Sequence, residues 1–189
     1  MKQAVALVVL LLGLLPAPAR AEDPPVSQQA LLLLRILAYD RELKNRSGGK
    51  KVVVAVAYRP GDKSSEEARA RVVGALQDAA DNTTVLGMPV IVVSLAADGG
   101  LDDRVASARP AALYLCPGLE DSAAQIVPVT RKRSVLSFSP RPDPVKNGVA
   151  VGLSVRGLRT AILVNLAAAR AEGVDFESAF LRVAEVQKP

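Results

Sequence analysis

The run KVVVAVAY (Lys51–Tyr58) restricts the folds open to this chain more than any other stretch of it. Its apolar, mostly β-branched residues continue without a polar interruption, whereas a strand with one solvated face would alternate. Such a run is typical of a strand that is buried on both faces, with helices above and below its sheet. We therefore expect an α/β fold that contains this strand.

Similar apolar runs recur along the chain, and helical patterns separate them. The further predicted strands are 88–96, which we also expect to be buried, 110–118 and 134–140. Between them, 98–108 is a short polar helix or a loop, and 119–133 is a connecting helix that Pro128 is expected to interrupt. This alternation of strand and helix is typical of a parallel sheet with right-handed crossovers.

One predicted helix precedes the first strand and another follows it. Residues 27–43 are apolar almost all round, so this helix is expected to be buried against the sheet, with Ser27 as its N-cap. Ser64 and Glu67 match the S-x-x-E capping box, which predicts that a second helix begins there. The apolar stripe of the second helix consists of Ala68, Val72, Ala75, Leu76 and Ala79.

The pattern changes near residue 148, where GVAVGLSV and LRTAILVN flank Arg156-Gly157 and each alternates. A two-residue turn at Arg156-Gly157 would place all facing apolar residues on one side of a hairpin. The predicted pairs are Val155–Leu158, Leu153–Thr160, Val151–Ile162 and Val149–Val164. We expect this hairpin to extend the parallel sheet with antiparallel strands.

The chain closes with two short predicted helices. Asn165 is expected to cap the first helix, and Gly173 to end it in a left-handed conformation. Asp175 or Ser178 would cap the second helix, whose expected buried residues are Phe180, Val183 and Ala184. Residues 22–189 are thus predicted to form one α/β domain: a mostly parallel sheet with flanking helices, extended by an antiparallel C-terminal hairpin and two short helices.

The first 21 residues have the features of a secretory signal peptide. Met1-Lys2 precedes an apolar run at 4–15, and Ala19-Arg20-Ala21 matches the small-x-small cleavage pattern, so cleavage is expected between Ala21 and Glu22. The alternative is an uncleaved anchor, but the apolar run is shorter than the roughly 20 residues of a membrane-spanning helix. The mature chain is therefore expected to be exported to the periplasm, without insertion in the membrane.

The residue inventory excludes many chemistries. Without histidine, the chain lacks the commonest general base and the usual ligand of zinc sites, and it has none of the glycine-rich phosphate-binding motifs. Asp102-Asp103 and Glu120-Asp121 are the obvious carboxylate pairs, but adjacent acids in polar loops are typical of solvated surface or of helix starts. Residues 98–103 lack the alternating ligands and terminal Glu of an EF-hand loop. We assign no catalytic residue, cofactor or metal site.

The net charge and the cysteine content limit the kinds of partner and disulfide that we expect. The net charge of +5 falls to +3 once Lys2 and Arg20 leave with the signal peptide, and only 131–133 forms a basic cluster, so no nucleic-acid partner is expected. Cys116 is the single cysteine, which excludes an intramolecular disulfide. Its apolar context favours a packed thiol, with an intermolecular disulfide as the alternative.

A small-ligand pocket is the one site that the predicted fold suggests. Open parallel sheets bind ligands beyond the carboxyl ends of their strands. The residues at or near those ends are Tyr58, Arg59, Ser94, Cys116 and Ser139. They are small or polar, which suits a pocket but is equally typical of ordinary loop residues.

The segment 147–184 (NGVAVGLSVRGLRTAILVNLAAARAEGVDFESAFLRVA) resembles the C-terminal signature of the periplasmic YfiR/HmsC-like family. That signature is a glycine-led hairpin, then Asn-Leu-x-x-Ala-Arg, a Gly and a short helix. The matching residues are Gly148, Asn165, Leu166, Ala169, Arg170, Gly173, Ser178, Leu181 and Ala184. Upstream, AALYLCPG and SVLSFS resemble strands of the same family.

The resemblance implies an exported, non-enzymatic α/β protein. Some members of the family repress a diguanylate cyclase of the inner membrane, and others accompany sensor kinases or outer-membrane receptors. This chain departs from the family at 38–43, where members often carry a Trp-Pro pair, and its single cysteine excludes the internal disulfides of redox-responsive members. The resemblance therefore implies a membrane signalling protein as partner and leaves the oligomeric state open.

Two further functions remain as alternatives. The first is a small-ligand-binding module that resembles one lobe of a solute-binding protein. The second is an enzyme that uses only carboxylates or serine, which the sparse set of acid and base groups disfavours.

Overall fold

The computed structural model describes residues 23–157 and 159–187, and the predicted signal peptide with its Ala21–Glu22 cleavage site lies outside them. The strands are β1 (Val52–Tyr58), β2 (Val90–Ala96), β3 (Ala112–Leu115), β4 (Leu136–Ser139), β5 (Val151–Arg156), β6 (Arg159–Asn165) and β7 (Glu185–Gln187). The helices are α1 (Val26–Ala38), α2 (Leu43–Ser47), α3 (Lys63–Asp81), α4 (Leu101–Ala108), η1 (Glu120–Ser122), α5 (Ala123–Arg133), α6 (Asp143–Lys146), α7 (Leu166–Ala171) and α8 (Ser178–Leu181).

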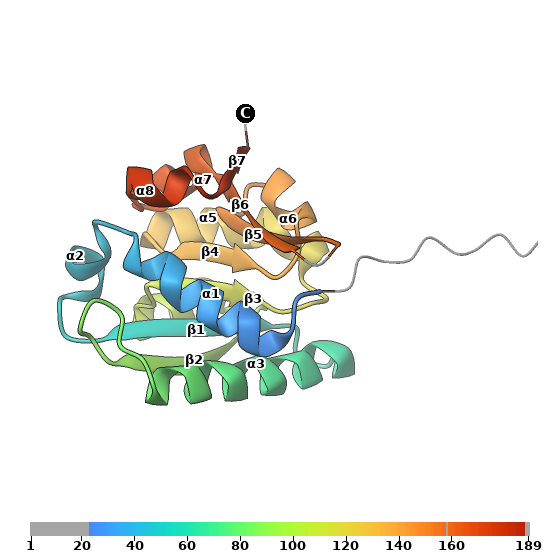
Figure 1. The fold of residues 1–189 in the computed structure, drawn as a ribbon. Helices are drawn as coiled ribbons and strands as arrows, with labels where there is room; N and C mark the ends of the chain where they lie inside the picture. The colour runs from blue at the N-terminus through green and yellow to red at the C-terminus, as the bar shows by residue number, and fades with distance from the viewer. Residues whose placement is uncertain (1–22, 158, 188–189) are drawn as a thin grey trace, which may run out of the picture.

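The strands form one seven-stranded sheet in the order β2-β1-β3-β4-β5-β6-β7 (Figure 1). Strands β1 to β5 pair in parallel, β6 is antiparallel to β5, and β7 is parallel to β6. The prediction of a single α/β domain with a mostly parallel sheet and an antiparallel hairpin is confirmed. The structure adds α2, α6 and β7, which are too short to have a recognisable sequence period.

Strand β1 contributes to two separate apolar layers, as its continuous apolar run predicted. Val52, Val54 and Val56 belong to the core that includes residues of α1 and α3. Ala55 and Ala57 face the other layer, which includes residues of α4 and α5. Every residue of β1 before Tyr58 is buried. The prediction that the strand at 88–96 is also buried is wrong, because β2 is an edge strand and Ile91 remains 43% exposed.

The first predicted helix is shorter than expected, and a second short helix, α2, follows it after a turn. Helix α1 follows Pro25 without a side-chain cap, so Ser27 is not the N-cap, and α1 ends at Ala38 rather than continuing to Leu43. At the turn, the carboxylate of Asp40 accepts hydrogen bonds from the backbone N–H of Glu42 and of Asp175 (both 3.0 Å). These contacts fix a turn that helical periodicity alone does not reveal.

The second helix begins at a different cap from the predicted one. Asp62 is the N-cap of α3 and accepts a hydrogen bond from the Ser65 N–H (3.0 Å), so the Ser64/Glu67 capping box is wrong. Glu66 accepts a hydrogen bond from the N–H of Gly61 instead (3.0 Å). The predicted stripe is confirmed, with Ala75 half-buried and the rest buried.

Pro128 lies inside α5 without interrupting it. Its ring is exposed, so the carbonyl group that loses its helical partner can turn toward water. The predicted interruption is therefore wrong. Residues 98–108, left open between helix and loop, form α4 at their C-terminal end.

The hairpin forms, but its register is shifted by two residues from the predicted one. Val155 pairs with Thr160, Leu153 with Ile162 and Val151 with Val164, so the turn lies between Arg156 and Arg159. A shift of two keeps every side chain on its predicted face. It also places Gly157, with φ +59°, first in the turn, where hairpin turns require a positive φ.

The closing segment is predicted well at its start and less well at its end. The Asn165 side chain accepts a hydrogen bond from the Ala168 N–H (3.0 Å), and Gly173 has φ +73°, as expected. Neither Asp175 nor Ser178 caps α8, whose N-cap residue is Glu177. Phe180 is buried as predicted, and Ala184 is half-buried. Val183 is 77% exposed, because α8 ends at Leu181 and its helical period does not continue.

Candidate functional site

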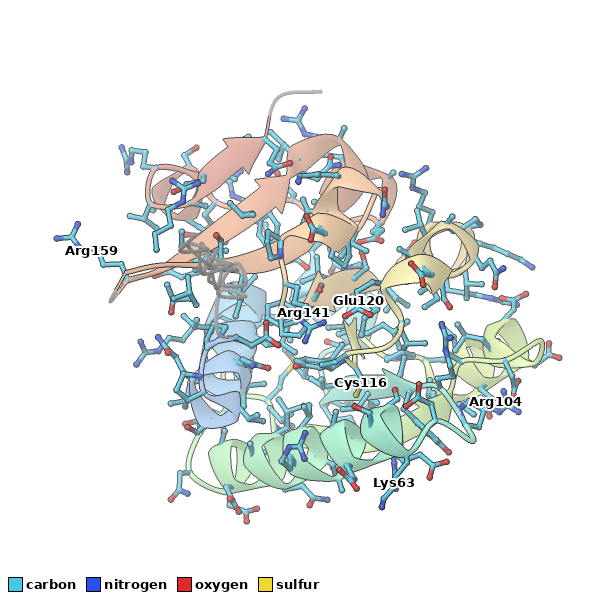
Figure 2. The ribbon with its side chains drawn as sticks, turned by 90° about the vertical axis from the view of Figure 1, so that its right-hand side faces the viewer. Lys63, Arg104, Cys116, Glu120, Arg141 and Arg159 are labelled. Carbon is cyan, nitrogen blue, oxygen red and sulfur yellow. The ribbon has the colours of Figure 1, made fainter. Side chains whose placement is uncertain are left out.

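The carboxyl ends of β1, β3 and β4 meet at one edge of the sheet, which Figure 2 views from the front. Tyr58 ends β1, and the guanidinium of Arg69 lies 4.9 Å from the centre of its ring. Arg59 donates a hydrogen bond through Nη2 to the hydroxyl of Ser122 (3.1 Å). The buried hydroxyl of Ser139 accepts a hydrogen bond from the Arg141 N–H (3.1 Å).

The structure separates Ser94 from the other predicted pocket residues. Ser94 lies within β2, pairs with Val56 and is exposed, two residues before the end of its strand. Cys116 does lie at the carboxyl edge, but it is 2% exposed. Burial raises the pKa of its thiol to about 12, so the thiol stays protonated and poorly reactive at neutral pH. These features favour packing over disulfide exchange.

Sequence reasoning missed the central residue of this edge, Arg141. Its Nε donates to both carboxylate oxygens of Asp23 (3.1 and 3.0 Å), and its Nη1 forms an ion pair with Glu120 (2.6 Å). Glu120 in turn accepts a hydrogen bond from the N–H of Gly118 (2.8 Å). Figure 2 shows Arg141 and Glu120 beside each other at the centre of the edge. The only sequence signal for this junction was a charged residue directly after a buried strand.

A pocket of about 360 Å³ lies between the segment 23–26 and helix α3. Two buried polar side chains stand on its wall: Tyr114 donates its hydroxyl proton to the side-chain oxygen of Gln29, and Gln29 donates through Nε2 to the carbonyl of Pro24 (2.5 Å). The other lining residues are Asp23, Pro25, Val26, Ala68, Arg71, Val72 and Pro117. The pocket is thus mainly apolar, with a few polar groups.

One member of each acidic pair of the sequence is engaged with a basic residue: Asp102 with Lys132 and Arg133, and Glu120 with Arg141. Lys132 and Arg133 bond to the carboxylate of Asp102 (2.7 and 2.6 Å) and hold its pKa well below its usual range. Asp98 forms an ion pair with Arg104 (2.5 Å), and this hydrogen bond lowers the pKa of Asp98. Within residues 23–157 and 159–187, no three His, Cys, Asp or Glu residues are grouped to hold a metal ion.

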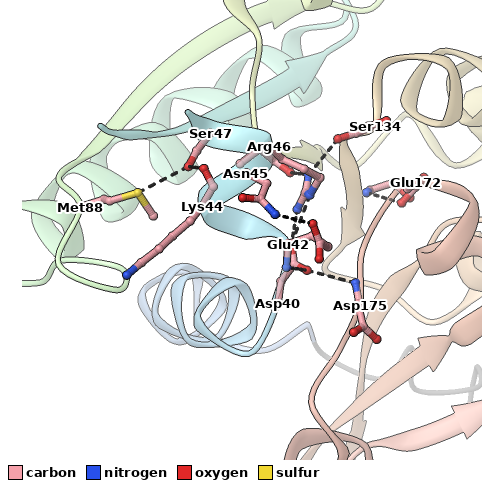
Figure 3. A network of polar contacts seen from close by, with 12 residues as sticks. Asp40, Glu42, Lys44, Asn45, Arg46, Ser47, Met88, Ser134, Glu172 and Asp175 are labelled. Atoms are coloured by element: carbon pink, nitrogen blue, oxygen red, sulfur yellow. Dashed lines mark hydrogen bonds and ion pairs between the residues drawn. The ribbon is translucent and has the colours of Figure 1, made fainter. Parts of the chain in front are cut away.

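A buried ion pair lies at the opposite end of the parallel strands, where β3 and β4 begin (Figure 3). The side chains of Asp40 and Arg46 are 0% and 9% exposed, and they are joined by Nη2 and Nε of Arg46 (2.5 and 3.2 Å). Arg46 also donates to the carbonyl of Ala111 (3.0 Å), directly before β3, and to the carbonyl of Ser134 (2.8 Å), two residues before β4. The Asp175 N–H completes the network by donating to Asp40.

Glu172 is a second buried carboxylate that the sequence did not reveal. Its oxygens accept hydrogen bonds from the hydroxyls of Thr130 and Ser137 (both 2.6 Å) and from the Ser137 N–H (2.8 Å). Burial raises its pKa to about 7, although the hydrogen bonds from Ser137 and Thr130 oppose this shift. Glu172 thereby connects the end of α7 to both α5 and β4.

The residues of the family signature have structural positions. Gly148 has φ +96°, and a Cβ there would lie 3.3 Å from an Arg131 nitrogen. A Cβ on Gly173 would lie 3.3 Å from the Ser134 side chain. The remaining residues are the capping Asn165, the buried Ala169, the half-buried Leu166, Leu181 and Ala184, and the exposed Arg170 and Ser178. None of the signature residues lines the pocket of about 360 Å³.

Comparisons with solved structures find the same fold in proteins of low identity. A conserved domain protein from Vibrio cholerae has a TM-score of 0.61 at 14% identity, covering 87% of this chain and 60% of that one. A substrate binding protein with adhesive properties from Clostridium difficile, in its ligand-free open structure, has 0.58 at 16% identity, covering 85% and 59%. An ABC domain in complex with L-Trp from Streptococcus pneumonia has 0.57 at 12% identity, covering 86% and 62%.

This chain therefore spans about 60% of the length of the solved proteins that it resembles. The comparison with curated proteins gave no significant match. No helix among residues 23–157 and 159–187 is long and apolar enough to cross a membrane. The model of the YfiR/HmsC-like family matches residues 28–185, nearly all of the described chain, and the protein belongs to that family.

Proposed function

We propose that this protein is an exported periplasmic regulator that binds the periplasmic part of a membrane signalling protein, such as a diguanylate cyclase of the inner membrane. The match of the YfiR/HmsC-like family model to residues 28–185 is the observation that carries this proposal. A non-enzymatic role agrees with it, because neither this family nor the substrate-binding fold is catalytic. The engagement of Asp98, Asp102 and Glu120 in ion pairs also supports a non-enzymatic role.

The apolar surface near the C-terminus is the best candidate for partner contact. Val183 and Val186 are 77% and 41% exposed, and Tyr39, which stacks on Phe180 at 5.4 Å between ring centres, is 40% exposed. We call Tyr39, Val183 and Val186 the C-terminal apolar surface. Large exposed apolar side chains are typical of interaction sites where they lie together, and the contact with Phe180 places Tyr39 beside the helix that precedes Val183. Figure 1 shows α8 and β7 at the end of the molecule opposite β2.

The test compares a double variant with a matched control in the native host. V183D/V186D places two charges on the C-terminal apolar surface, whereas I91D changes an exposed apolar residue on β2, the other edge strand. Deletion of the gene should change cellular cyclic di-GMP and biofilm. The I91D gene should restore the wild-type levels, and V183D/V186D should not, although its purified protein folds normally by circular dichroism.

One result would contradict the proposed regulatory role, and another would contradict only the contact surface. If deletion leaves cyclic di-GMP and biofilm unchanged, and no membrane protein co-purifies with the tagged chain, repression of a cyclase is excluded. If both variants restore the wild-type levels, the regulatory role stands but the C-terminal apolar surface is not the contact site.

A small-ligand-binding module is the second candidate function. The pocket of about 360 Å³ at the carboxyl edge favours it, because open parallel sheets bind ligands there. Two structural relatives, a substrate binding protein and a protein in complex with L-Trp, agree with such a role. A thermal shift screen of metabolites tests it, since a ligand at a hundred times its dissociation constant stabilises by about 2.7 kcal/mol. A uniformly flat screen would count against it.

A further inference from the structure

The segment 23–25 covers the place where a ligand would enter the carboxyl edge. It is fixed by two separate contacts: Asp23 to Arg141, and the carbonyl of Pro24 to the side-chain amide of Gln29. Gln29 is in turn held by the hydroxyl of Tyr114. Residues of this segment form one wall of the 360 Å³ pocket. Since Asp23 and Arg141 are 31% and 41% exposed, their ion pair is accessible to a competing anion.

The contact between Asp23 and Arg141 has the geometry of ligand recognition. The guanidinium binds the carboxylate side-on, with Nε at 3.1 and 3.0 Å from the two oxygens and Nη2 at 3.0 Å from one of them. A planar guanidinium fork recognises planar carboxylates in this manner. The position of Arg141 does not depend on Asp23 alone, because Glu120 holds Nη1 at 2.6 Å and is itself fixed by the Gly118 N–H.

The charges around the pocket also favour an anion once Asp23 leaves. Arg71 lines the pocket, and Arg59 lies at the same edge with a bond to Ser122. Neither Arg59 nor Arg71 forms an ion pair with another residue of the described chain. Departure of Asp23 would leave Glu120 as the single acidic partner of Arg141 among the described residues, with Arg71 on the pocket wall.

We propose that Arg141 is the anchor of a binding site for a small carboxylate with an apolar body, and that Asp23 occupies this anchor as an intramolecular stand-in. The ligand carboxylate replaces the Asp23 carboxylate on Arg141, the segment 23–25 moves aside, and the apolar body enters the pocket beside Val72 and Pro117. This proposal rests on the small-ligand function and adds to it the ligand class, the anchoring residue and the competing segment.

The proposal predicts how single substitutions change the affinity for a probe carboxylate. Benzoate is the probe, and benzamide is its neutral isostere; binding is measured by ligand-observed NMR on the exported and processed protein. Because a site that is mostly occupied by its own segment binds in proportion to its open fraction, D23N should bind benzoate about tenfold more tightly than the wild type. R141Q should lose binding, and benzamide should bind none of the proteins.

Asp143 provides the matched control for Asp23. It is a 75% exposed carboxylate next to Lys146 in α6, so D143N changes the net charge by the same amount without touching Arg141. D143N should bind benzoate with the wild-type affinity. R141K keeps the charge but loses the planar fork, so it should weaken binding, and it replaces R141Q if that variant does not fold.

The side-chain amide of Gln29 reports displacement of the segment, because it donates to Pro24. Benzoate should shift its NMR resonance in the wild-type protein. The proposal is overturned if R141Q or R141K binds benzoate as the wild type does, if D23N and D143N bind equally, or if the Gln29 resonance stays fixed while benzoate binds. Equal affinity for inorganic phosphate would overturn the carboxylate class.

Failure of this proposal can be distinguished from failure of the small-ligand function. If the metabolite screen finds a ligand that binds D23N, R141Q and the wild type equally, the small-ligand function stands and Arg141 is not its anchor. If neither the screen nor benzoate gives binding to the wild type or to D23N, both are excluded.

Discussion

Glu172 illustrates how a single residue in this protein combines stability with sensitivity to pH. Its side chain is fully buried, and three donors from Thr130 and Ser137 surround its oxygens. Burial disfavours the charged form, so the pKa rises from its usual 4.5 to about 7 in the folded protein. The folded state therefore binds this proton more tightly than the unfolded state does.

The sign of the pH dependence follows from this difference. The stability that protonated Glu172 contributes is fully present below about pH 4.5 and is lost as the pH rises through about 7. Between pH 5 and 8 the wild type should lose about 2.5 kcal/mol relative to E172Q, whose neutral amide resembles the protonated acid. Urea unfolding at both pH values measures this. The exposed Glu67 supplies the control E67Q, whose stability should change with pH as that of the wild type does. If the stability of E172Q also changes with pH as that of the wild type does, the assignment is refuted.

Asp40 and Asp175 allow a comparison of a buried and an exposed ion pair in one neighbourhood. In the first pair, the side chains of Asp40 and Arg46 are 0% and 9% exposed. In the second pair, those of Asp175 and Arg41 are 56% and 53% exposed. Breaking a buried pair leaves an uncompensated charge, so D40A should lower the free energy of unfolding by about 3–5 kcal/mol. D175A should cost less than about 1 kcal/mol. Equal losses in chemical denaturation would show that burial does not control the contribution of these pairs.

At the scale of elements, β5 depends on a close approach that the sequence pattern does not display. A Cβ on Gly152 would lie 2.4 Å from a Val145 methyl carbon of α6 and 2.8 Å from the carbonyl oxygen of Arg141. The short helix α6 can therefore lie against β5 only because residue 152 has no side chain. This contact also orders the loop that carries Arg141.

Two glycine-to-alanine substitutions test this packing with opposite expected signs. G152A should destabilise the protein by about 1–3 kcal/mol, because the backbone of the loop must move. Gly74 lies in α3 with no heavy atom within 4 Å of an added Cβ, so G74A should stabilise by about 0.5–1 kcal/mol. Thermal unfolding of both variants decides the matter. A neutral G152A would mean that α6 does not pack against β5 in solution.

At the scale of the whole molecule, the two ends of the described chain stabilise one another. The Arg41 N–H donates to the carbonyl of Asp175 (2.9 Å), and the Glu177 N–H donates to the carbonyl of Tyr39 (3.0 Å). Asp40 and Phe176 also form an isolated antiparallel bridge. The turn after α1 and the segment before α8 thus form one unit with the sheet, although about 135 residues separate them.

Such cross-links predict a single cooperative unfolding transition. The chain has three tyrosines, each in a different region. Tyr39 reports on the contact with α8, Tyr58 on the carboxyl end of β1, and Tyr114 on the core. Urea transitions followed by tyrosine fluorescence and by far-ultraviolet circular dichroism should therefore coincide. An earlier transition in a variant that retains only Tyr39, with Tyr58 and Tyr114 changed to Phe, would show that the C-terminal segment detaches first.

The sequence by itself determined the elements whose signal is local. The run in β1, the stripe of α3, the strand-to-helix joint at Asn165 and the left-handed Gly173 depend on periodicity and backbone preference, and each is present in the structure. The family signature is of the same kind, since its residues serve backbone geometry and packing.

Only the tertiary structure decided the features that depend on distant partners. The edge position of β2, the turn at Asp40, the burial of Glu172 and the junction of Arg141 with Asp23 join residues far apart in the chain. The predicted pocket residues show the same division: Tyr58, Arg59, Cys116 and Ser139 lie at the carboxyl edge, whereas strand order places Ser94 on the outermost strand. The edge position of a strand and the partners of a polar side chain are properties of neighbours in space, and a linear pattern contains no record of them.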